Sequence, residues 1–301
     1  MRVATHLFKL SFPAGVSFGG GRLSDSPMAL RADTLFSALC IESLRRGGSA
    51  EELAGLAKSG GLLLSDGFPY GGGKLYGPKP FVRPQGAGRS KAKRFKERRH
   101  IPLAKMRDYA DGKLDEADCA GDSDFGETEL ATKAAVSRTG EAAKPYNVRA
   151  YRFRPGAGLY FLAVTKDAGT RAMLESLMES LSATGIGGKK SAGYGRFSVE
   201  VSQADELRLG GEAPLYVSLS VGLPKDGEME AALDGAGYGL VKRSGFVASA
   251  DCAEGFARRR DLFAFASGSV FRARFEGDVY DVGGGGHPVY LYAKPVFLGL
   301  G

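Results

Sequence analysis

Alternating apolar and polar positions predict strands at the start, in the middle and near the end of the chain. Residues 3–12 alternate clearly, and the larger side chains on one face of this strand are His6, Phe8, Leu10 and Phe12. Residues 158–165 are apolar almost throughout, which is typical of a strand buried on both faces. The remaining predicted strands are 62–64, 196–201, 215–221, 262–275 and 289–298.

Apolar residues three to four positions apart predict helices between these strands. Asp33 is placed to cap the first helix, which carries Leu35 and Leu39 on one side. Ser49 followed by Glu52 is a capping-box pattern for a second, short helix. The other predicted helices are 171–181 and 228–233.

The order of these elements predicts an α+β protein. Each half runs from a strand through a helix to further strands and then repeats part of this order, as in a βαββαβ ferredoxin-like (RRM-like) unit. We therefore expect two such domains, at residues 1–130 and 131–301, each a sheet with helices on one face.

A charged segment separates the two predicted domains. Residues 83–107 are strongly basic, residues 108–129 are strongly acidic, and few apolar residues interrupt either block. Such stretches bury little apolar surface and seldom form a core. We expect residues 84–130 to be an insertion that is partly mobile.

Composition limits the classes of function. The chain has 301 residues, 45 glycines and a formal net charge of +7, and a basic balance favours polyanionic partners such as nucleic acid. Three widely separated cysteines argue against a zinc site or a disulfide framework and fit a reducing cytoplasm. No apolar run approaches the roughly 18 residues of a membrane span. The sequence predicts a cytoplasmic protein with no metal, no cofactor and no membrane partner.

The strongest motif is the loop GIGGKKSAGYGR at residues 185–196, between a predicted helix and a predicted strand. Its glycines let backbone amides approach an anion closely, and its cations, hydroxyl and aromatic ring suit a phosphate and a base. A helix cap followed by a tight turn is the simpler interpretation. The mixture of groups favours phosphate contact, and the spacing fits neither a Walker A loop nor a dinucleotide fingerprint. The candidate RNA contacts are Gly187, Gly188, Lys189, Lys190, Ser191, Tyr194 and Arg196.

A second glycine-rich loop, SFGGGRLS at residues 17–24, repeats this chemistry with fewer groups. Its candidate contacts are Phe18, Gly19, Gly20 and Arg22. A plain connection between a strand and a helix explains the same residues, so both interpretations stay open. The basic run at residues 89–99 is more simply a solvated segment than a phosphate track.

No catalytic motif accompanies these loops. His6 falls in a predicted strand, His100 in the charged insertion and His287 before a proline, and none belongs to a known acid–base motif. The sequence contains no HExxH or GxSxG motif, and no DxD or paired-carboxylate motif of a catalytic site falls in a segment expected to be ordered. We therefore expect a protein that is not an enzyme.

Several stretches resemble one family. The loop GIGGKKSAGYGRF resembles the glycine-rich loop of the RAMP superfamily of CRISPR proteins. The opening FKLSFPAGVSFGGGRLSDSPMALRADTLFSAL is similar to the type III-A Csm-complex subunit that caps the 5′ end of the guide RNA, and so are the later stretches KPYNVRAYRF, KRSGFVAS and HPVYLYAKPVFL. The resemblance covers nearly the whole chain except the insertion at residues 86–129.

This resemblance implies two RRM-like domains and a structural role in antiviral defence. It implies binding of the repeat-derived 5′ tag of the CRISPR RNA (crRNA), with a large polymerase-like subunit on one side and a backbone RAMP subunit of the Csm complex on the other. Family members carry a thumb β-hairpin, for which residues 132–151 are the best candidate, with Arg138 and Thr139 near its tip. The stretch KRSGFVAS adds Arg243 and Ser244 to the expected RNA contacts.

Two other functions stay open. A RAMP endoribonuclease that processes precursor crRNA would share the fold and the glycine-rich loop. Such enzymes commonly use a histidine near the end of the first strand, and residues 13–25 contain none. In a general RNA-binding protein, the third alternative, the apolar segments 263–271 and 289–298 would serve equally as core or as protein contact.

Overall fold

The computed structural model describes residues 4–18, 28–84, 95–135, 144–207, 209, 211–247, 258–284 and 287–301. The first strand, β1 (Ala4–Ser11), pairs with β8 (Gly158–Thr165) on one side and with β9 (Ser198–Gln203) on the other. The rings of Phe8 and Phe161 lie opposite each other and stack, with centroids 4.7 Å apart. The buried strand predicted at residues 158–165 is confirmed.

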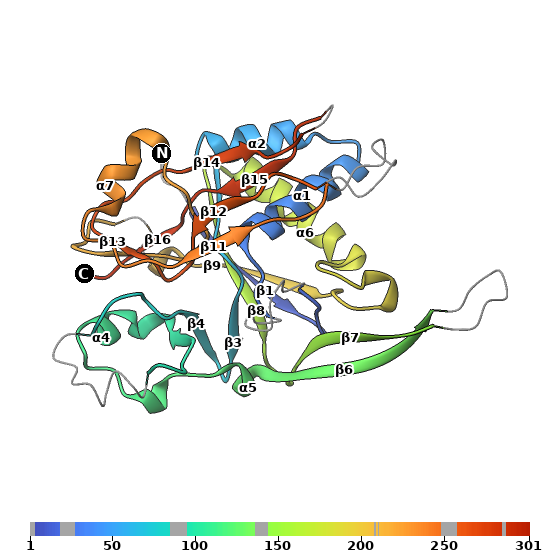
Figure 1. The fold of residues 1–301 in the computed structure, drawn as a ribbon, viewed down its shortest axis with the longest axis horizontal. Coiled ribbons are helices and arrows are strands. Elements are labelled where there is room, and N and C mark those ends of the chain that lie inside the picture. Colours follow the sequence, from blue (N-terminus) through green and yellow to red (C-terminus); the bar gives the residue numbers. More distant parts are fainter. Residues whose placement is uncertain are drawn as a thin grey trace.

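The sheet continues from β8 toward a second edge. β2 (Leu62–Leu64) and β3 (Phe68–Gly71) both pair with β8, and β4 (Lys74–Pro78) and β5 (His100–Pro102) follow. The strand order is β5-β4-β3-β8-β1-β9, and every pair in this seven-stranded sheet is antiparallel (Figure 1).

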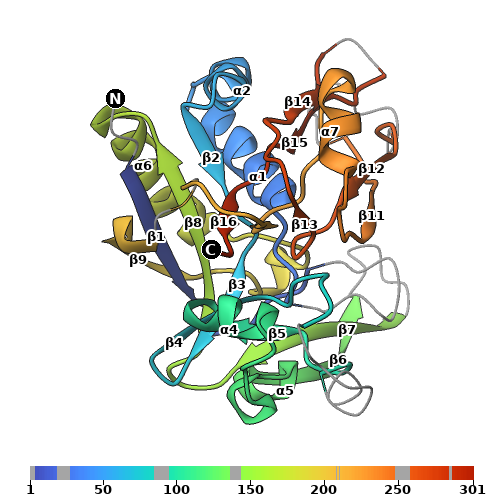
Figure 2. The same cartoon turned by 90° about the vertical axis from the view of Figure 1, so that its left-hand side faces the viewer.

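Helices pack on one face of this sheet. α1 (Ala32–Arg45) and α6 (Ala168–Thr184) contact each other and share one core with β1 and β8, and α2 (Ala50–Lys58) lies beside α1 (Figure 2). Burial of this apolar surface is the dominant favourable contribution to folding. The large buried residues of these core elements include Phe8, Leu10, Leu35, Phe36, Leu39, Leu159, Phe161, Leu174, Leu177, Met178 and Leu181. In the part of the chain that the structure describes, no helix is both long and apolar enough to cross a bilayer.

The strand order β3-β8-β1-β9, with α1 and α6 as connections, is that of a βαββαβ unit. This unit is assembled from two separate parts of the chain, residues 4–71 and 158–203. β8, α6 and β9 lie after residue 130 in the chain and pack with β1, which lies before it, while the predicted domain boundary itself stays a prediction. Alternation along the chain identifies a strand but not its partner, so this long-range pairing leaves no local signal.

Residues 95–125 of the predicted insertion are folded. They contain β5, η1 (Leu103–Lys105), α4 (Met106–Ala110), η2 (Glu116–Asp118) and α5 (Asp122–Phe125). They pack on the face of the sheet that carries Leu7, Tyr160 and Leu162. The buried residues of this segment in that second core are Phe95, Ile101, Leu103, Met106, Tyr109, Leu114 and Cys119.

Ion pairs join the basic and acidic blocks of this segment. Arg98 lies 3.5 Å from Glu116, Arg99 lies 3.5 Å from Asp122, and Lys105 lies 2.9 Å from Asp118. The two blocks compensate each other's charge and their sparse apolar residues are buried together, so residues 95–125 of the expected insertion have a core.

β6 (Gly126–Ala135) and β7 (Lys144–Phe153) form a hairpin that projects from the rest of the molecule (Figure 1). Their register pairs Gly126 with Phe153 and Ala135 with Lys144. A hairpin was expected at residues 132–151, and the structure contains one there that starts earlier and ends slightly later. Its role as a thumb remains a prediction.

The described part of the C-terminal half forms three small antiparallel sheets and short helical segments. The strands of these sheets are β13 (Val270–Phe271), β10 (Tyr216–Ser218) and β16 (Phe297–Gly299) in the first, β11 (Leu240–Arg243) and β12 (Leu262–Phe265) in the second, and β14 (Asp278–Asp281) and β15 (Tyr290–Ala293) in the third. The helical segments after β9 are η4 (Asp205–Leu207), η5 (Asp226–Glu228) and α7 (Met229–Leu233).

The predicted strands at residues 262–275 and 289–298 are too long. Gly268 adopts a φ of +93° between β12 and β13, and Pro295 lies between β15 and β16. Both residues interrupt extended pairing, because the glycine reverses the backbone and the proline lacks a donor. The mixed helices and antiparallel sheets agree with the predicted α+β class, while a second βαββαβ unit in this half remains a prediction.

The buried carboxylate of Asp66 connects the first helix to the C-terminal half. Its Oδ1 accepts hydrogen bonds from the backbone N–H groups of Ala32 at 2.8 Å and Val221 at 3.2 Å, and its Oδ2 accepts one from Arg31 at 3.0 Å. The sequence assigned the helix cap to Asp33, but α1 begins one residue before Asp33 and its first amide is capped by Asp66. A cap supplied from another part of the chain has no sequence signature.

We predict that Asp66→Ala lowers the free energy of unfolding by about 3 kcal/mol, because it leaves two buried amides and a half-buried guanidinium without their acceptor. Asp66→Asn should be less damaging, since its amide oxygen still accepts from Ala32. Urea denaturation followed by circular dichroism measures both, with the exposed Glu230→Ala as the control. A midpoint for Asp66→Ala equal to that of the wild type would contradict this role.

Candidate nucleic-acid interface

At the C-terminal end of α6 the longer glycine-rich loop contacts residues 15–18, which lead into the shorter one; residues 19–24 of the shorter loop lie outside the described residues. The amide of Gly188 donates to the carbonyl of Ser17 at 2.8 Å, and the amide of Gly195 donates to the carbonyl of Gly15 at 3.0 Å. The ends of the longer loop are closed by the amide of Ile186, which donates to the carbonyl of Gly195 at 2.9 Å. Segments that the sequence placed far apart therefore form one structure.

Glycine is required at two positions of this contact. A Cβ on Gly195 would lie 2.1 Å from the carbonyl oxygen of Ile186, a distance that real Cβ atoms do not reach. Gly187 has a φ of +90°, and a Cβ there would lie 3.0 Å from the carbonyl of Ser17. A side chain at Gly187 would push the loop away from Ser17, and one at Gly195 would open the closed ends of the loop itself.

The base of the projecting hairpin joins the same cluster. Val16 and Tyr151 exchange backbone hydrogen bonds of 2.9 and 2.7 Å. Ser17 Oγ donates to the carbonyl of Arg149 at 3.0 Å. Tyr194, in the longer loop, is buried against Val148 and Ala150 of β7. Both glycine-rich segments and the hairpin base are thus fixed to one another.

The longer loop presents its cations on the surface. Gly188, Lys189, Lys190, Ser191 and Arg196 are exposed, and the residues Lys190–Ala192 form a 3-10 turn, η3. Lys189 has a left-handed backbone with a φ of 58°, which is unusual for a residue other than glycine. Their contact with a phosphate stays a prediction.

The two predicted aromatic contacts are buried instead. Tyr194 is 6% exposed and packs on the hairpin, and Phe18 is 8% exposed and lies edge-on to Phe12 with centroids 6.5 Å apart. Of the other predicted contacts, Gly19, Gly20, Arg22, Arg138 and Thr139 lie outside the described residues. Their roles stay predictions.

A cavity of about 1010 Å³ opens beside the loop. Its wall includes Gly187, Gly188 and Lys190 from the loop, one side of α1, the end of β11 and the start of the folded insertion. Among the described lining residues, ten are cations and three are carboxylates. The cations are Arg31, Arg45, Lys79, Lys96, Arg98, Arg99, Lys190, Lys242, Arg243 and Arg259, and the carboxylates are Asp33, Glu42 and Asp66.

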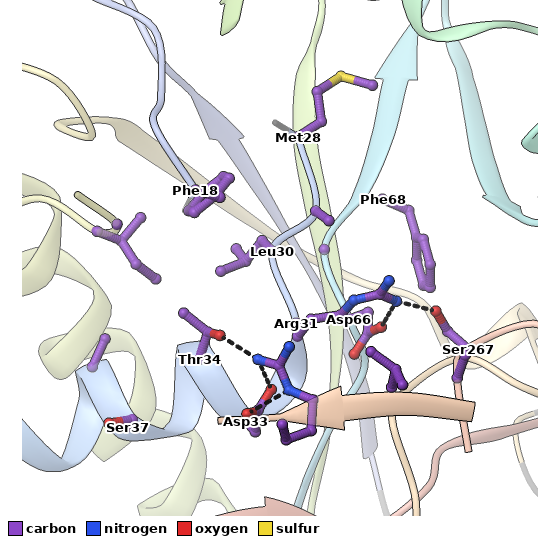
Figure 3. A pocket seen from close by; sticks show the side chains of 18 of the residues that line it. Phe18, Met28, Leu30, Arg31, Asp33, Thr34, Ser37, Asp66, Phe68 and Ser267 are labelled. Carbon is purple, nitrogen blue, oxygen red and sulfur yellow. Dashed lines mark hydrogen bonds and ion pairs between the residues drawn. The ribbon is translucent and has the colours of Figure 1, made fainter. Parts of the chain in front are cut away.

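Arg243, a predicted RNA contact, takes part in a buried charge cluster in this wall. Its guanidinium lies 2.8 Å from Asp33 and donates to Thr34 Oγ1 at 3.1 Å (Figure 3). Arg259 also approaches Asp33, at 3.4 Å, and donates to the carbonyl of Ser244 at 3.2 Å. Ser244 is exposed beside this cluster. Arg243 thus holds β11 against the start of α1.

A second charged group lies close by in the same wall. Arg31 donates to both Asp66 and Ser267 at 3.0 Å, near the apolar side chains of Leu30 and Phe68 (Figure 3). Arg31, Lys79 and Lys242 line the cavity without any signal in the sequence, because each is a cation outside the basic run and the glycine-rich loops. Three members of the basic run, judged to be solvated, also line the cavity: Lys96, Arg98 and Arg99.

One histidine lines the cavity. His100, on β5, lies with Nδ1 3.5 Å from Asp122 Oδ1, and burial lowers its pKa to about 4 although Asp122 acts in the opposite direction. His6 is buried in β1 with Nε2 3.1 Å from Thr165 Oγ1, and His287 contacts the carbonyl of Pro288. Within the described ranges, no group of three or more histidine, cysteine or acidic residues is arranged to hold a metal ion.

Comparison with known proteins decides the family. The CRISPR system Cms protein Csm4 of Mycobacterium tuberculosis (strain ATCC 25618 / H37Rv) is 39% identical over 300 residues, which cover 98% of each chain. The protein of the same name from Streptococcus thermophilus is 33% identical over 300 residues, with 94% of this chain and 95% of the relative covered. The chain belongs to the Csm4 family. The family model of the CRISPR Csm4 C-terminal domain matches residues 211–300.

Solved structures of Csm4 proteins share the fold. The crystal structure of a Csm3-Csm4 subcomplex in the type III-A CRISPR-Cas interference complex contains a chain that matches with a TM-score of 0.67 at 18% identity, over 98% of both chains. The crystal structure of a Csm1-Csm4 cassette in complex with AMPPNP matches with a TM-score of 0.64 at 22% identity, over 98% of this chain and 97% of the other. The resemblance to this CRISPR family, expected from the sequence, is confirmed.

The buried histidine generates a pH prediction. In the unfolded chain His100 titrates near 6.5, so between about pH 6.5 and 4 the unfolded state binds a proton that the folded state does not. Stability should therefore fall as the pH is lowered through this window, by at most about 1.4 kcal/mol per pH unit for one proton. In urea denaturation, His100→Gln should show a shallower decline than the wild type. His287→Gln is the control, and equal slopes for His100→Gln and wild type would contradict the prediction.

Proposed function

We propose that the chain is the crRNA-binding structural subunit of a type III-A Csm complex and holds the 5′ tag of the crRNA in this cavity. The observation that carries the proposal is the meeting of two glycine-rich segments, the hairpin base and a cationic wall at one place. The membership in the Csm4 family supplies the CRISPR context.

The geometry suits single-stranded RNA. Exposed backbone and cations on a loop such as 188–191 contact phosphates without reading sequence, which fixes the register of a strand. A positively charged channel contributes affinity through the release of counterions. Cations outnumber carboxylates among the described lining residues, and Asp33, Glu42 and Asp66 are buried and bonded within the protein. The wall therefore presents positive charge to the solvent.

Assembly completes the proposed function. The solved relatives are a Csm3-Csm4 subcomplex and a Csm1-Csm4 cassette. We propose that this chain likewise contacts a large polymerase-like subunit on one side and a backbone RAMP subunit on the other. The projecting hairpin β6–β7 is the proposed thumb, because its base is hydrogen-bonded to Val16 and Ser17 and packs against Tyr194 of the longer loop, while its far end extends away from them.

One observation favours the alternative of a RAMP endoribonuclease. His100 lies in the cavity wall, where a general base would meet RNA. Its ring is largely buried, its neighbour is Asp122, and its pKa of about 4 makes it a weak general base at physiological pH. No second histidine lines the cavity within the described residues. The structural role is the better supported of the two.

The loop is tested by removing two charges. Lys189→Ala with Lys190→Ala should weaken binding of tag-containing RNA and reduce the slope of log affinity against log salt by up to about 1.4, at roughly 0.7 for each lost phosphate contact. Fluorescence anisotropy of labelled RNA over a series of KCl concentrations gives both quantities. The control is Lys58→Ala with Lys74→Ala, which removes two exposed lysines outside the cavity. Wild-type affinity and slope for the loop variant would refute phosphate contact by these lysines.

The absence of an active site is tested separately. Incubation of the purified chain with a repeat-containing RNA, with and without divalent metal, should give no specific cleavage. A specific product that persists in the wild type but disappears in His100→Ala would establish the endoribonuclease. His6→Ala and His287→Ala are the controls. Equal cleavage by the wild type and all three variants would indicate a contaminating nuclease.

A further inference from the structure

The cavity contains exposed aromatic rings that differ from those the sequence indicated. Tyr194 and Phe18 are buried, whereas Phe81 is 47% exposed and Phe246 is 64% exposed, and both line the cavity. Large apolar side chains left in contact with water carry a free-energy cost, and exposed ones beside a binding groove mark a contact surface. Of the two rings, Phe81 is packed against well-defined glycine backbone.

The ring of Phe81 packs against the backbone of glycine residues. Its amide donates to the carbonyl of Gly268 at 2.8 Å. A Cβ added to Gly239 would lie 2.9 Å from the ring, and one added to Gly268 would lie 3.3 Å from it. Gly237 approaches equally closely, because its Cβ would meet the carbonyl oxygen of Phe81. The ring is supported from the protein side by flat backbone, while nearly half of the residue stays exposed on the cavity side.

Cations line the same cavity as this ring, and the amide of Lys79 donates to the carbonyl of Arg99 at 3.0 Å. Lys79, two residues earlier, is held in place because its Nζ donates to the carbonyls of Phe95 at 2.6 Å and Lys96 at 3.3 Å. Lys96, Arg98 and Arg99 line the same cavity. The ion pairs of Arg98 and Arg99 with Glu116 and Asp122 fix their positions without burying them, since their side chains remain 35% and 52% exposed.

A supported ring among cations is the combination that binds single-stranded nucleic acid, since every base has a π-face and every linkage a phosphate. A protein partner would be expected to need an apolar surface with fewer charges at its centre. We propose that Phe81 is a base-stacking residue that holds one nucleobase of the bound RNA, with the basic segment 96–99 beside it as a phosphate contact. This proposal rests on the proposed function, because it assumes that the cavity binds RNA.

The test uses the full-length chain and the tag-containing RNA of its own CRISPR repeat. Phe81→Leu should weaken binding about 5- to 30-fold, while Phe81→Tyr, which keeps the ring, should bind like the wild type. The salt slope should not change for either variant, because no phosphate contact is removed. Phe263→Leu, a 59% exposed ring on β12 outside the cavity, is the matched control and should bind normally.

Abasic RNAs separate stacking from other roles of the ring. Each abasic RNA lacks one base of the tag. At one position, loss of the base should lower the affinity of the wild type to that of Phe81→Leu for the intact RNA. The affinity of Phe81→Leu should not fall further at that same position. An equal loss on every RNA, or wild-type affinity for Phe81→Leu, overturns the proposal. Loss of subunit capture with unchanged RNA affinity also overturns it and assigns Phe81 to a protein contact.

The loop variant keeps the two claims distinguishable. If Lys189→Ala with Lys190→Ala weakens RNA binding and Phe81→Leu does not, the cavity binds RNA and the stacking claim alone fails. If neither affects binding, the RNA site lies elsewhere and both claims fail. Circular dichroism of Phe81→Leu and Phe81→Tyr verifies that each variant is folded before its affinity is interpreted.

Discussion

The antiparallel pairing of β1 with both β8 and β9 determines where the proposed RNA site lies in the fold. Because β1 ends at Ser11 and β9 begins at Ser198, the segment that follows β1 and the loop that precedes β9 leave the sheet at the same end. The amides of Gly188 and Gly195 then bond to carbonyls of residues 15–17. Without this pairing the two glycine-rich segments would be unrelated loops, and the wall of the cavity would lose its main support.

Buried carboxylates connect the remaining parts of that wall. Asp66 bonds the first amide of α1, the amide of Val221 and the guanidinium of Arg31, and Asp33 pairs with Arg243 of β11. Each carboxylate is about 1% exposed, so removal of a partner would leave a charge in a poorly solvated place. The C-terminal half is thereby held against α1 by the same charges that line the cavity.

Local chemistry was predictable from the sequence and long-range pairing was not. The motif at 185–196 and the strand at 158–165 follow from glycine content and apolar runs, which act within a few residues. The strands that pair with β8 could not be predicted, because the pattern of side chains along a strand does not depend on which strands it joins. The folded insertion was missed because Arg98 and Glu116 compensate each other only once the chain folds. The burial of Tyr194 against β7 likewise depends on a hairpin 40 residues or more away in the chain.

In the cavity wall, the buried carboxylates bond to other parts of the protein, whereas several cations remain exposed to solvent. Glu42 is 2% exposed and accepts hydrogen bonds from Ser180 at 2.6 Å and Thr184 at 3.0 Å, so its negative charge is used in joining α1 to α6. Arg99 and Arg45 in the same wall remain about half exposed. A carboxylate that is bonded internally repels a phosphate less than one that faces it, whereas an exposed cation keeps its donors for the ligand. The arrangement therefore gives rigidity from the acidic groups and attraction from the basic ones, which is what a groove needs to hold a flexible, negatively charged strand in a single register.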